Sequence, residues 1–317
     1  MVTFSDIQSA YDRIQDGSNK TPVMTSRTLN NLVQAEIYLK CENFQRGGAF
    51  KFRGTYNKLL LLSDKDKAKG IITHSSGNHA QAVALASKEL GIKAVVVMPK
   101  NAPSIKVAAT KGYGAEVVFC NNSVEDRVSV CSHLQQKHGY TLVHPYDDED
   151  IIAGAGTAAY ELIQEVGDLD MIFCPVGGGG LISGTSLATK GMLPKASVIG
   201  VEPARADDAA RSLQQKKLQP STYPDTIADG LRTSLSPLTF SLIQQHVDDI
   251  ITVSEQQIID AMKFLWMRMK LVVEPSGSVG FAGVCSHHLL VKNKRIGVIL
   301  SGGNVDLSPF FESLDKN

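Results

Sequence analysis

The stretch PVGGGGLISG, residues 175–184, joins an apolar run to a helical pattern through four consecutive glycines. Glycine adopts backbone conformations that other residues avoid and carries no side chain, so the N–H groups of such a loop can surround an anion. The first turn of the following helix adds the positive end of its dipole. A plain tight turn is the ordinary alternative, but a loop placed after a strand and before a helix favours anion binding.

The common glycine motifs for nucleotides do not match this loop. A GxGxxG dinucleotide motif starting at Gly177 or Gly178 would need a third glycine where the chain has Ile182 or Ser183. A P-loop in this position would need a lysine where the chain has Thr185. The loop therefore predicts a site for a single phosphate monoester.

On both sides of this loop, short β-branched runs alternate with helical patterns. The runs are IITHS, KAVVVMP, AEVVFC and YTLVHP before it and SVIGVEP and RIGVILSGG after it. Pro103 fits the first turn of one helix, and a short helix follows the last strand. This alternation predicts an α/β fold with two domains, each with a mainly parallel twisted sheet flanked by helices. The small domain, residues 67–145, would be inserted into a large domain formed by residues 1–66 and 146–317.

The composition excludes several classes of partner. The 317 residues include 32 Lys plus Arg and 32 Asp plus Glu, so no net charge would attract nucleic acid or an anionic membrane. No apolar stretch approaches the roughly 20 residues that span a bilayer, and the N-terminal MVTFSDIQSAYDRIQ lacks a secretory pattern. The five cysteines contain no CxxC pair. We expect a cytoplasmic protein without a zinc site that binds small molecules.

A second feature is the lysine in FQRGGAFKFRGT, residues 44–55. Lys51 stands between Phe50 and Phe52. A lysine among apolar neighbours either extends its amine to water or is kept there for chemistry. The local sequence fits both interpretations.

Two further segments place polar groups at strand ends. HSSGNHA, residues 74–80, crowds hydroxyl and amide groups around a glycine, although its serines can be ordinary helix caps and its histidine purely structural. SGGNVD, residues 301–306, follows the last strand with a hydroxyl and two glycines. A phosphate loop, a lysine near aromatics and these hydroxyls together suggest pyridoxal phosphate. The lysine would form a Schiff base, the loop would hold the 5′-phosphate, and a neutral hydroxyl would meet the pyridine nitrogen.

Motifs along almost the whole chain resemble the serine racemases and serine/threonine dehydratases, which are fold type II pyridoxal-phosphate enzymes. They are KTPV (20–23), NFQRGGAFKFRG (43–54), SSGNHAQA (75–82), GAGT (154–157), PVGGGG (175–180), VEP (201–203), TIADG (226–230), RMKLVVEPSG (268–277) and LSGGNVD (300–306). EPARADDAA and RMKLVVEPSG are more similar to eukaryotic-type racemases than to dedicated threonine dehydratases. The resemblance implies a fold like that of the tryptophan synthase β subunit, with the cofactor in the cleft between the domains.

The resemblance also implies roles for the residues that match its motifs. Lys51 would form the Schiff base and act as the base on one face of the cofactor. Phe50 would pack beside the pyridine ring, Asn78 would bond the 3′ oxygen, and Ser301 would face the pyridine nitrogen. The phosphate cup would consist of Gly177, Gly178, Gly179, Gly180 and Leu181, and the substrate side of the cleft of Ser75, Ser76, Asn78, His79 and Arg127.

Ser76 helps to distinguish racemisation from elimination as the expected reaction. Racemisation needs an acid/base on each face of the planar carbanion, and Ser76 is similar in position to the second-face serine of the family. Many threonine dehydratases have alanine there, but some dehydratases and sulfhydrylases have serine. The resemblance implies a serine racemase that interconverts L-serine and D-serine and also eliminates water from serine to give pyruvate and ammonia.

Two alternatives remain open. The first is an L-serine/L-threonine dehydratase, or a 3-hydroxyaspartate dehydratase, with little racemase activity. The second is a protein of another class, which binds a nucleotide or metabolite without catalysis. The expected ligand is therefore a small amino acid, either serine or possibly threonine or hydroxyaspartate.

Glu202, the carbonyl of Ala206 and Asp208 match the divalent-cation site of the family. Two carboxylates, a backbone oxygen and waters suit Mg²⁺, or else Mn²⁺ or Ca²⁺. By itself such an acidic stretch would be interpreted as a solvated helix start.

Some positions depart from the family pattern. Mammalian racemases have Ser-Ser and Lys-Thr in their nucleotide-binding modulator site, where this chain has Ser26-Arg27 and Arg46-Gly47, so ATP as a modulator stays open. Tyr146 stands where an asparagine is common, and Thr233 replaces a serine, which can change substrate preference. The family also suggests a homodimer.

Overall fold

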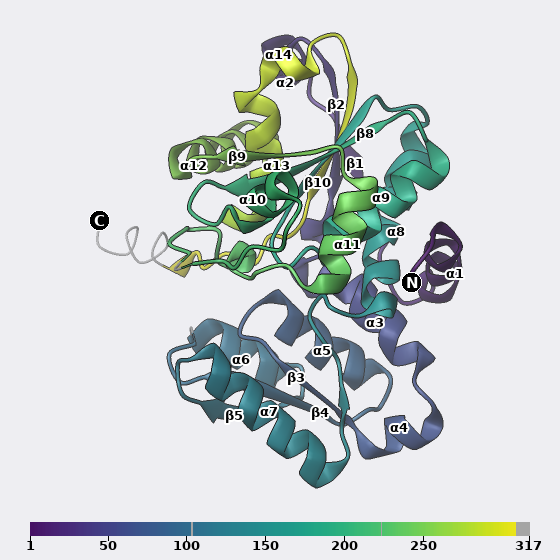
Figure 1. Cartoon of the computed structure of the whole chain (residues 1–317), viewed down its shortest axis with the longest axis vertical. Helices are drawn as coiled ribbons and strands as arrows, with labels where there is room; N and C mark the ends of the chain where they lie inside the picture. Colours follow the sequence, from purple (N-terminus) through teal and green to yellow (C-terminus); the bar gives the residue numbers. More distant parts are fainter. Residues whose placement is uncertain (103, 223, 309–317) are drawn as a thin grey trace.

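The computed structural model describes residues 1–308 except Pro103 and Tyr223, and Figure 1 shows its two lobes. The helix start expected at Pro103 and the short helix expected at the C-terminus lie outside the described residues. Helix α3 (Lys51–Leu61) lies where the two lobes meet (Figure 1).

Six strands form the larger sheet, in the order β1-β2-β10-β7-β8-β9. All neighbours are parallel except β1, which pairs antiparallel with β2 at the edge. Parallel strands covered on both faces are almost continuously apolar, which explains why these runs do not alternate with polar residues. The strands are Val23–Met24 (β1), Glu36–Cys41 (β2), Met171–Pro175 (β7), Ser197–Pro203 (β8), Asp249–Val253 (β9) and Arg295–Leu300 (β10).

Four parallel strands form the smaller sheet, in the order β5-β4-β3-β6. They are Ile71–His74 (β3), Ala94–Pro99 (β4), Glu116–Cys120 (β5) and Thr141–Leu142 (β6). All four come from the stretch predicted as the small domain, whereas the larger sheet takes strands from both sides of it. The α/β fold class is confirmed, and the boundaries at residues 67 and 145 stay a prediction.

Helices cover the faces of both sheets (Figure 1). Around the smaller sheet they are Asp64–Lys69 (α4), Asn78–Glu89 (α5), Ser104–Gly112 (α6) and Val124–His138 (α7). The remaining helices are Phe4–Ile14 (α1), Arg27–Val33 (α2), Glu149–Val166 (α8), Gly180–Met192 (α9), Asp208–Gln215 (α10), Pro237–His246 (α11), Glu255–Phe264 (α12), Pro275–Ser286 (α13) and His288–Val291 (α14). Among the described residues, none of these helices has the length and apolar character needed to cross a membrane.

Glycines bring α3, α8 and α9 into very close contact. A Cβ atom added at Gly154 of α8 would lie 2.6 Å from the Cα of Gly54 on α3. A Cβ atom added at Gly184 of α9 would lie 2.5 Å from the backbone nitrogen of Gly156 on α8. No side chain fits at such distances. The GAGT segment (154–157) therefore sets the spacing between α8 and both of its neighbours.

A buried ion network connects α3 to α8 and to β2. Arg53 Nε contacts Glu42 Oε2 at 2.7 Å, and its Nη1 and Nη2 contact the two carboxylate oxygens of Glu161 at 2.7 and 2.8 Å. Lys40 Nζ donates to Glu161 Oε2 at 2.7 Å and to the carbonyl oxygen of Thr21 at 2.7 Å. All four charged residues are at most 3% exposed. Two positive and two negative charges cancel, so the network is neutral as a whole.

Removing the Arg53 charge is expected to destabilise the protein strongly. Arg53→Met would leave the carboxylates of Glu42 and Glu161 buried with a single cation, at a cost of roughly 3–5 kcal/mol in the free energy of unfolding. Urea unfolding followed by circular dichroism measures the change. Arg205→Met is the matched control because the Arg205–Asp225 pair is solvent-exposed, and its effect should stay within about 0.5 kcal/mol. Equal effects of the two substitutions would show that the buried network does not stabilise the fold.

Candidate active site

Lys51 is the first residue of α3. Its Nζ donates to the carbonyl oxygen of Pro145 at 2.7 Å and lies 5.0 Å from the centre of the Phe50 ring. Burial lowers the pKa of the amine from 10.5 to about 8, because the ammonium form loses hydration. Although part of its surface stays accessible, the amine is bonded inside the protein instead of extending into bulk water. A substantial neutral, nucleophilic fraction is present near pH 8.

The glycine loop connects the end of β7 to the start of α9, as the sequence predicts. Cβ atoms added at Gly178 and Gly179 would lie 2.4 Å from the ring of Tyr146 and 2.7 Å from the side chain of Thr239. In the part of the chain that the structure describes, the N–H groups of residues 177–182 have no acceptor, although all six residues are buried. Buried N–H groups are rarely left without partners. A phosphate group would satisfy these donors, so the loop fits the anion predicted from its sequence.

Ser301 follows β10 directly and is 5% exposed. Its carbonyl oxygen accepts a hydrogen bond from the backbone nitrogen of Phe50 at 3.0 Å. The next residue, Gly302, forms a β-bridge with Ala49. Two motifs about 250 positions apart in the sequence therefore lie side by side, and Ser301 neighbours the segment that carries Lys51.

The SSGN turn joins β3 to α5 in the small domain. Ser75 Oγ accepts a hydrogen bond from the Gly77 nitrogen at 3.3 Å, within its own turn. Ser76 is partly exposed, and its hydroxyl has no protein partner within the described part of the chain. Of the two serines, Ser76 thus keeps its hydroxyl available for a ligand.

Asn78 links the small domain to the large one. Its Nδ2 donates to Glu274 Oε1 at 2.5 Å, and its Oδ1 accepts from Asn304 Nδ2 at 3.0 Å. Glu274 is 3% exposed, and burial raises the pKa of its carboxyl to about 7. Sequence reasoning did not single out Glu274 or Asn304. The sequence features that could have indicated these two residues are a carboxylate within the otherwise apolar LVVEPSG and an amide within SGGN.

His79 lies behind this turn and is 2% exposed. Its Nε2 lies 3.0 Å from the carbonyl oxygen of Val143. Burial lowers the pKa of the ring well below its usual value, so the ring is neutral at pH 7. These observations support the structural role that the sequence left open, and little of the ring is accessible to a substrate.

Arg127 on α7 belongs to a cluster with His74, His144 and Tyr146. The ring centroids of His74 and His144 are 5.6 Å apart, and those of His144 and Tyr146 are 4.8 Å apart. Burial, the neighbouring His144 and the charge of Arg127 lower the pKa of His74 to about 4. Arg127 Nε is buried and has no partner among the described residues. A positive charge with an unused donor suits a carboxylate.

Glu202 and Asp208 form a second acidic centre, next to the glycine loop. Both are almost completely buried. Burial and the neighbouring Asp208 raise the pKa of Glu202 well above its usual value, and burial raises that of Asp208 to about 6. Asp208 Oδ1 has no partner within the described residues, whereas its Oδ2 accepts from the Leu235 nitrogen at 3.2 Å. The stretch is therefore not the solvated helix start that its composition would suggest.

A divalent cation would fit these carboxylates. A cation would favour the ionised form of both buried carboxyl groups and use the orphaned oxygen of Asp208. No group of three or more His, Cys, Asp or Glu side chains in the described residues could hold a metal. The carbonyl of Ala206 and waters would have to complete the ligand set.

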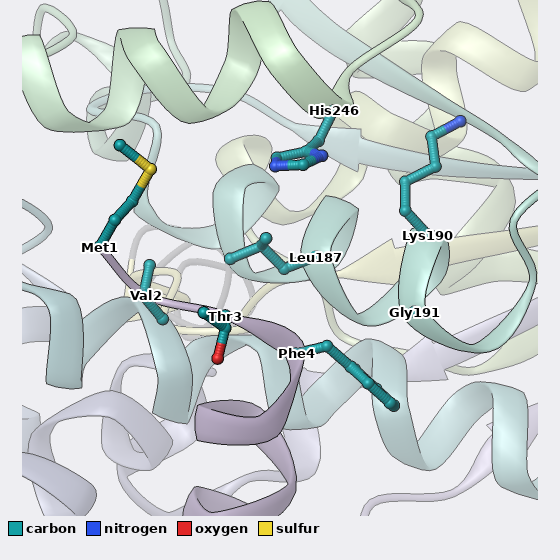
Figure 2. A pocket seen from close by; sticks show the side chains of 8 residues that line it. All are labelled: Met1, Val2, Thr3, Phe4, Leu187, Lys190, Gly191 and His246. Atoms are coloured by element: carbon teal, nitrogen blue, oxygen red, sulfur yellow. The ribbon is translucent and has the colours of Figure 1, made fainter.

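A separate groove of about 350 Å³ lies far from these motifs, between α1, the C-terminal half of α9 and α11 (Figure 2). It is lined by Met1, Val2, Thr3, Phe4, Leu187, Lys190, Gly191 and His246. Because the glycine loop precedes the opposite, N-terminal end of α9, this groove is not the predicted site. It also contains none of the residues of the predicted phosphate cup.

Comparison with known proteins identifies the family of this chain. The family model described as "Pyridoxal-phosphate dependent enzyme" matches residues 14–302. The chain is 49% identical to the L-threo-3-hydroxyaspartate ammonia-lyase of Saccharomyces cerevisiae, over 97% of this chain and 95% of the relative. It is 47% identical to the serine racemase of Schizosaccharomyces pombe, over 100% and 98%. The crystal structure of serine racemase from Dictyostelium discoideum superposes with a TM-score of 0.93 at 45% identity, covering 96% and 99%.

The pKa of Lys51 should be visible in its reactivity. In cofactor-free protein, amine labelling at Lys51 should rise with pH around a midpoint of about 8, because only the neutral amine reacts. Exposed lysines as a class have a midpoint near 10.4, so Lys51 should label first as pH rises. Pulse labelling followed by peptide mass spectrometry measures all sites in one experiment. A Lys51 midpoint above about 9.5 would contradict the effect of burial.

Proposed function

The chain belongs to the pyridoxal-phosphate-dependent enzymes, and we propose that within this family it interconverts L-serine and D-serine. We propose that it also eliminates water from serine to give pyruvate and ammonia. Support comes from two different proton-carrying groups, the amine of Lys51 and the hydroxyl of Ser76, on segments of different domains that hydrogen bonds join to each other.

The residues in this cleft fit the cofactor. The unpaired N–H groups of residues 177–182 would hold its phosphate, and Lys51 would bond covalently to its aldehyde carbon. Asn78 would bond the 3′ oxygen, and Ser301 would face the pyridine nitrogen. When bound, pyridoxal phosphate withdraws electrons from the substrate Cα and makes the Cα proton acidic. The protein supplies the groups that remove and return this proton.

Lys51 would remove the Cα proton from one face of the substrate. A pKa of about 8 suits this step, because a fraction of the amine is neutral near physiological pH and the group is basic enough to hold a proton. Delivery of a proton by the Ser76 hydroxyl to the opposite face would give D-serine, and return by Lys51 would regenerate L-serine. If a nearby acid instead protonated the β-hydroxyl, it would leave as water and give 2-aminoacrylate. Tautomerisation to the imine and addition of a water molecule would then release pyruvate and ammonia.

The observation that carries this proposal is the connection between the Ser76 turn and the large domain. Two residues after Ser76, Asn78 is bonded to Glu274 and Asn304 across the cleft. Lys51 in turn donates to the carbonyl oxygen of Pro145, just after the last strand of the small domain. These hydrogen bonds support the placement of the two proton carriers at one site between the domains.

A second candidate function is dehydration of 3-hydroxyaspartate, as in the relative from Saccharomyces cerevisiae. The observation that favours it is Arg127, whose Nε has no protein partner within the described residues. Such a group suits the second carboxylate that distinguishes hydroxyaspartate from serine. Comparing L-serine, L-threonine and L-threo-3-hydroxyaspartate in one assay would rank these substrates.

We also propose that Glu202, the carbonyl of Ala206 and Asp208 bind Mg²⁺, with Mn²⁺ or Ca²⁺ as alternatives. A cation bound here would have a structural function, because the site neighbours the segment that packs against the glycine loop. The backbone nitrogen of Leu235 donates to Asp208, and a Cβ atom at Gly179 would lie 2.8 Å from the Leu235 side chain. A cation at Asp208 would therefore support the segment that packs against the phosphate loop.

Three further features belong to the proposal. The family resemblance supports a homodimer, and the absence of cysteine pairs among the five free thiols supports a cytoplasmic location. Activation by ATP is not proposed, because Arg27 and Gly47 stand where the modulator site has serine and threonine, and the residues beside them have structural roles. Ser26 Oγ accepts from the Leu29 nitrogen and caps α2, and Arg46 pairs with Glu89.

Ser76→Ala should separate the two reactions. Without the second-face hydroxyl, formation of D-serine from L-serine should fall by about 100-fold or more, whereas pyruvate formation should fall much less because Lys51 is retained. Chiral chromatography and a pyruvate assay on the same samples measure both products.

Ser63→Ala is the matched control for this experiment. Ser63 is an exposed serine that caps α4, and its substitution should leave both products unchanged. A wild-type enzyme that forms pyruvate but no D-serine would refute the racemase proposal and favour the dehydratase.

Binding of Mg²⁺ should stabilise the protein. At about 100 times its Kd, the ion should add about 2.7 kcal/mol to the free energy of unfolding, and chelation should remove this gain. Thermal denaturation with MgCl₂ or EDTA measures it. Asp208→Asn should abolish the effect, while Asp225→Asn, at an exposed position, should preserve it. A gain that survives in Asp208→Asn would place the ion elsewhere.

A further inference from the structure

The side-chain amide of Asn78 has two chemically different ends. Nδ2 can only donate hydrogen bonds, and Oδ1 can only accept them. The 3′ oxygen of bound pyridoxal phosphate is an acceptor when ionised, so Asn78 binds it only if Nδ2 points toward it. The opposite orientation would bring two oxygens together. Correct binding therefore depends on what holds the amide in place.

The hydrogen bonds around Asn78 permit one orientation only. Asn304 Nδ2 donates to the backbone carbonyl oxygen of Gly47 at 2.7 Å, and a carbonyl oxygen cannot donate in return. The atom of Asn304 that contacts Gly47 is therefore the nitrogen Nδ2. The same Nδ2 also contacts Asn78, and because Nδ2 can only donate, the atom of Asn78 that it contacts must be the acceptor Oδ1. Its Nδ2 then points to Glu274 Oε1 at 2.5 Å, which accepts in either protonation state.

Two glycines make room for this arrangement. A Cβ atom at Gly48 would lie 2.3 Å from Asn304 Oδ1, and one at Gly302 would lie 2.4 Å from Glu274 Oε1 and 3.3 Å from Asn78 Nδ2. These glycines belong to the RGG and SGG segments that precede Lys51 and follow the last strand. Side chains there would displace the two groups that contact Asn78. The glycine pairs thus have a use beyond forming turns.

We propose that Glu274 and Asn304 are positioning residues that fix the amide of Asn78 with its remaining Nδ2 hydrogen available to the cofactor. Among the described residues Nδ2 has a single partner, so one hydrogen is left for the ring oxygen. Glu274 acts through its acceptor oxygen and need not be ionised. The same contacts connect the small domain to the large one, so cofactor binding and the relative position of the domains share these residues.

This inference rests on the cofactor of the family and on the contact expected for Asn78, and not on racemisation. Cofactor binding can be measured without any substrate. Failure of the racemase proposal would therefore leave the inference intact, and failure of the inference would leave the choice of reaction open.

Titration of cofactor-free protein with pyridoxal phosphate, followed by fluorescence and absorbance, tests the proposal. Asn78→Ala, Glu274→Ala and Asn304→Ala should each raise the apparent Kd about three- to tenfold, the worth of one hydrogen bond. Glu274→Gln should bind nearly as well as the wild type, because an amide oxygen also accepts. Asn304→Asp should bind as poorly as Asn304→Ala, because a carboxylate cannot donate to Asn78.

A double-mutant cycle separates positioning from a general structural effect. In the Asn78→Ala background, Glu274→Ala and Asn304→Ala should change the Kd by less than about twofold, because their effects pass through Asn78. The absorbance band of the bound cofactor should shift alike in all three single variants. Asn43→Ala is the control, since Asn43 bonds the carbonyl oxygen of Val272 near Glu274 and should leave the Kd unchanged.

Three results would overturn the proposal. One is an unchanged Kd in both Glu274→Ala and Asn304→Ala. Another is a full additional loss of affinity when either is combined with Asn78→Ala. The third is a Glu274→Gln variant as defective as Glu274→Ala, which would show that the charge or the proton of Glu274 acts, and not its acceptor oxygen. If Glu274→Ala does not fold, Glu274→Gln and Asn304→Asp still decide between these outcomes.

Discussion

The buried contact between Arg53 and the carboxylates of Glu42 and Glu161 is the constraint on which the rest of the site depends. Arg53 lies two residues after Lys51, so its guanidinium connects the first turn of α3 to α8 and to the end of β2. Both carboxylates are buried, and within the described residues Arg53 is the cation that pairs with Glu42, whereas Glu161 is also bonded to Lys40. Movement of Glu42 away from Arg53 would therefore leave a buried charge unpaired. The start of α3, and with it Lys51, is thereby held against the large domain.

Close helix packing extends this constraint to the phosphate loop. Gly54 and Gly154 bring α3 against α8, and Gly156 and Gly184 bring α8 against α9. The N-terminal ends of α3 and α9 are thus placed relative to each other through α8. The N–H groups that precede α9 and the amine that begins α3 would otherwise be independent features of two distant segments.

Contacts between the domains complete the cleft. Lys51 donates to the carbonyl oxygen of Pro145, Asn78 is held by Glu274 and Asn304, and Lys106 of α6 pairs with Asp229 of the large domain. Each of these contacts joins a residue of one domain to a residue of the other. In the proposed function, substrate choice belongs to the same region, because Arg127 would offer a donor to a second carboxylate and Ser76 would offer a proton to Cα.

The sequence by itself determined the α/β class, the two sheets and the motifs at their strand ends, because β-branched runs, helical spacing and glycine loops are local signals. It also placed Lys51, the glycine loop and SGGN in one predicted site, through resemblance to a family and not through any visible contact. It did not distinguish a solvated Lys51 from a buried one, because both have the same neighbours in sequence. Only the tertiary structure decided this, and only it showed Glu274 and Asn304 around Asn78. Burial and the direction of a hydrogen bond depend on residues that are about 200 positions apart along the chain and adjacent only after folding.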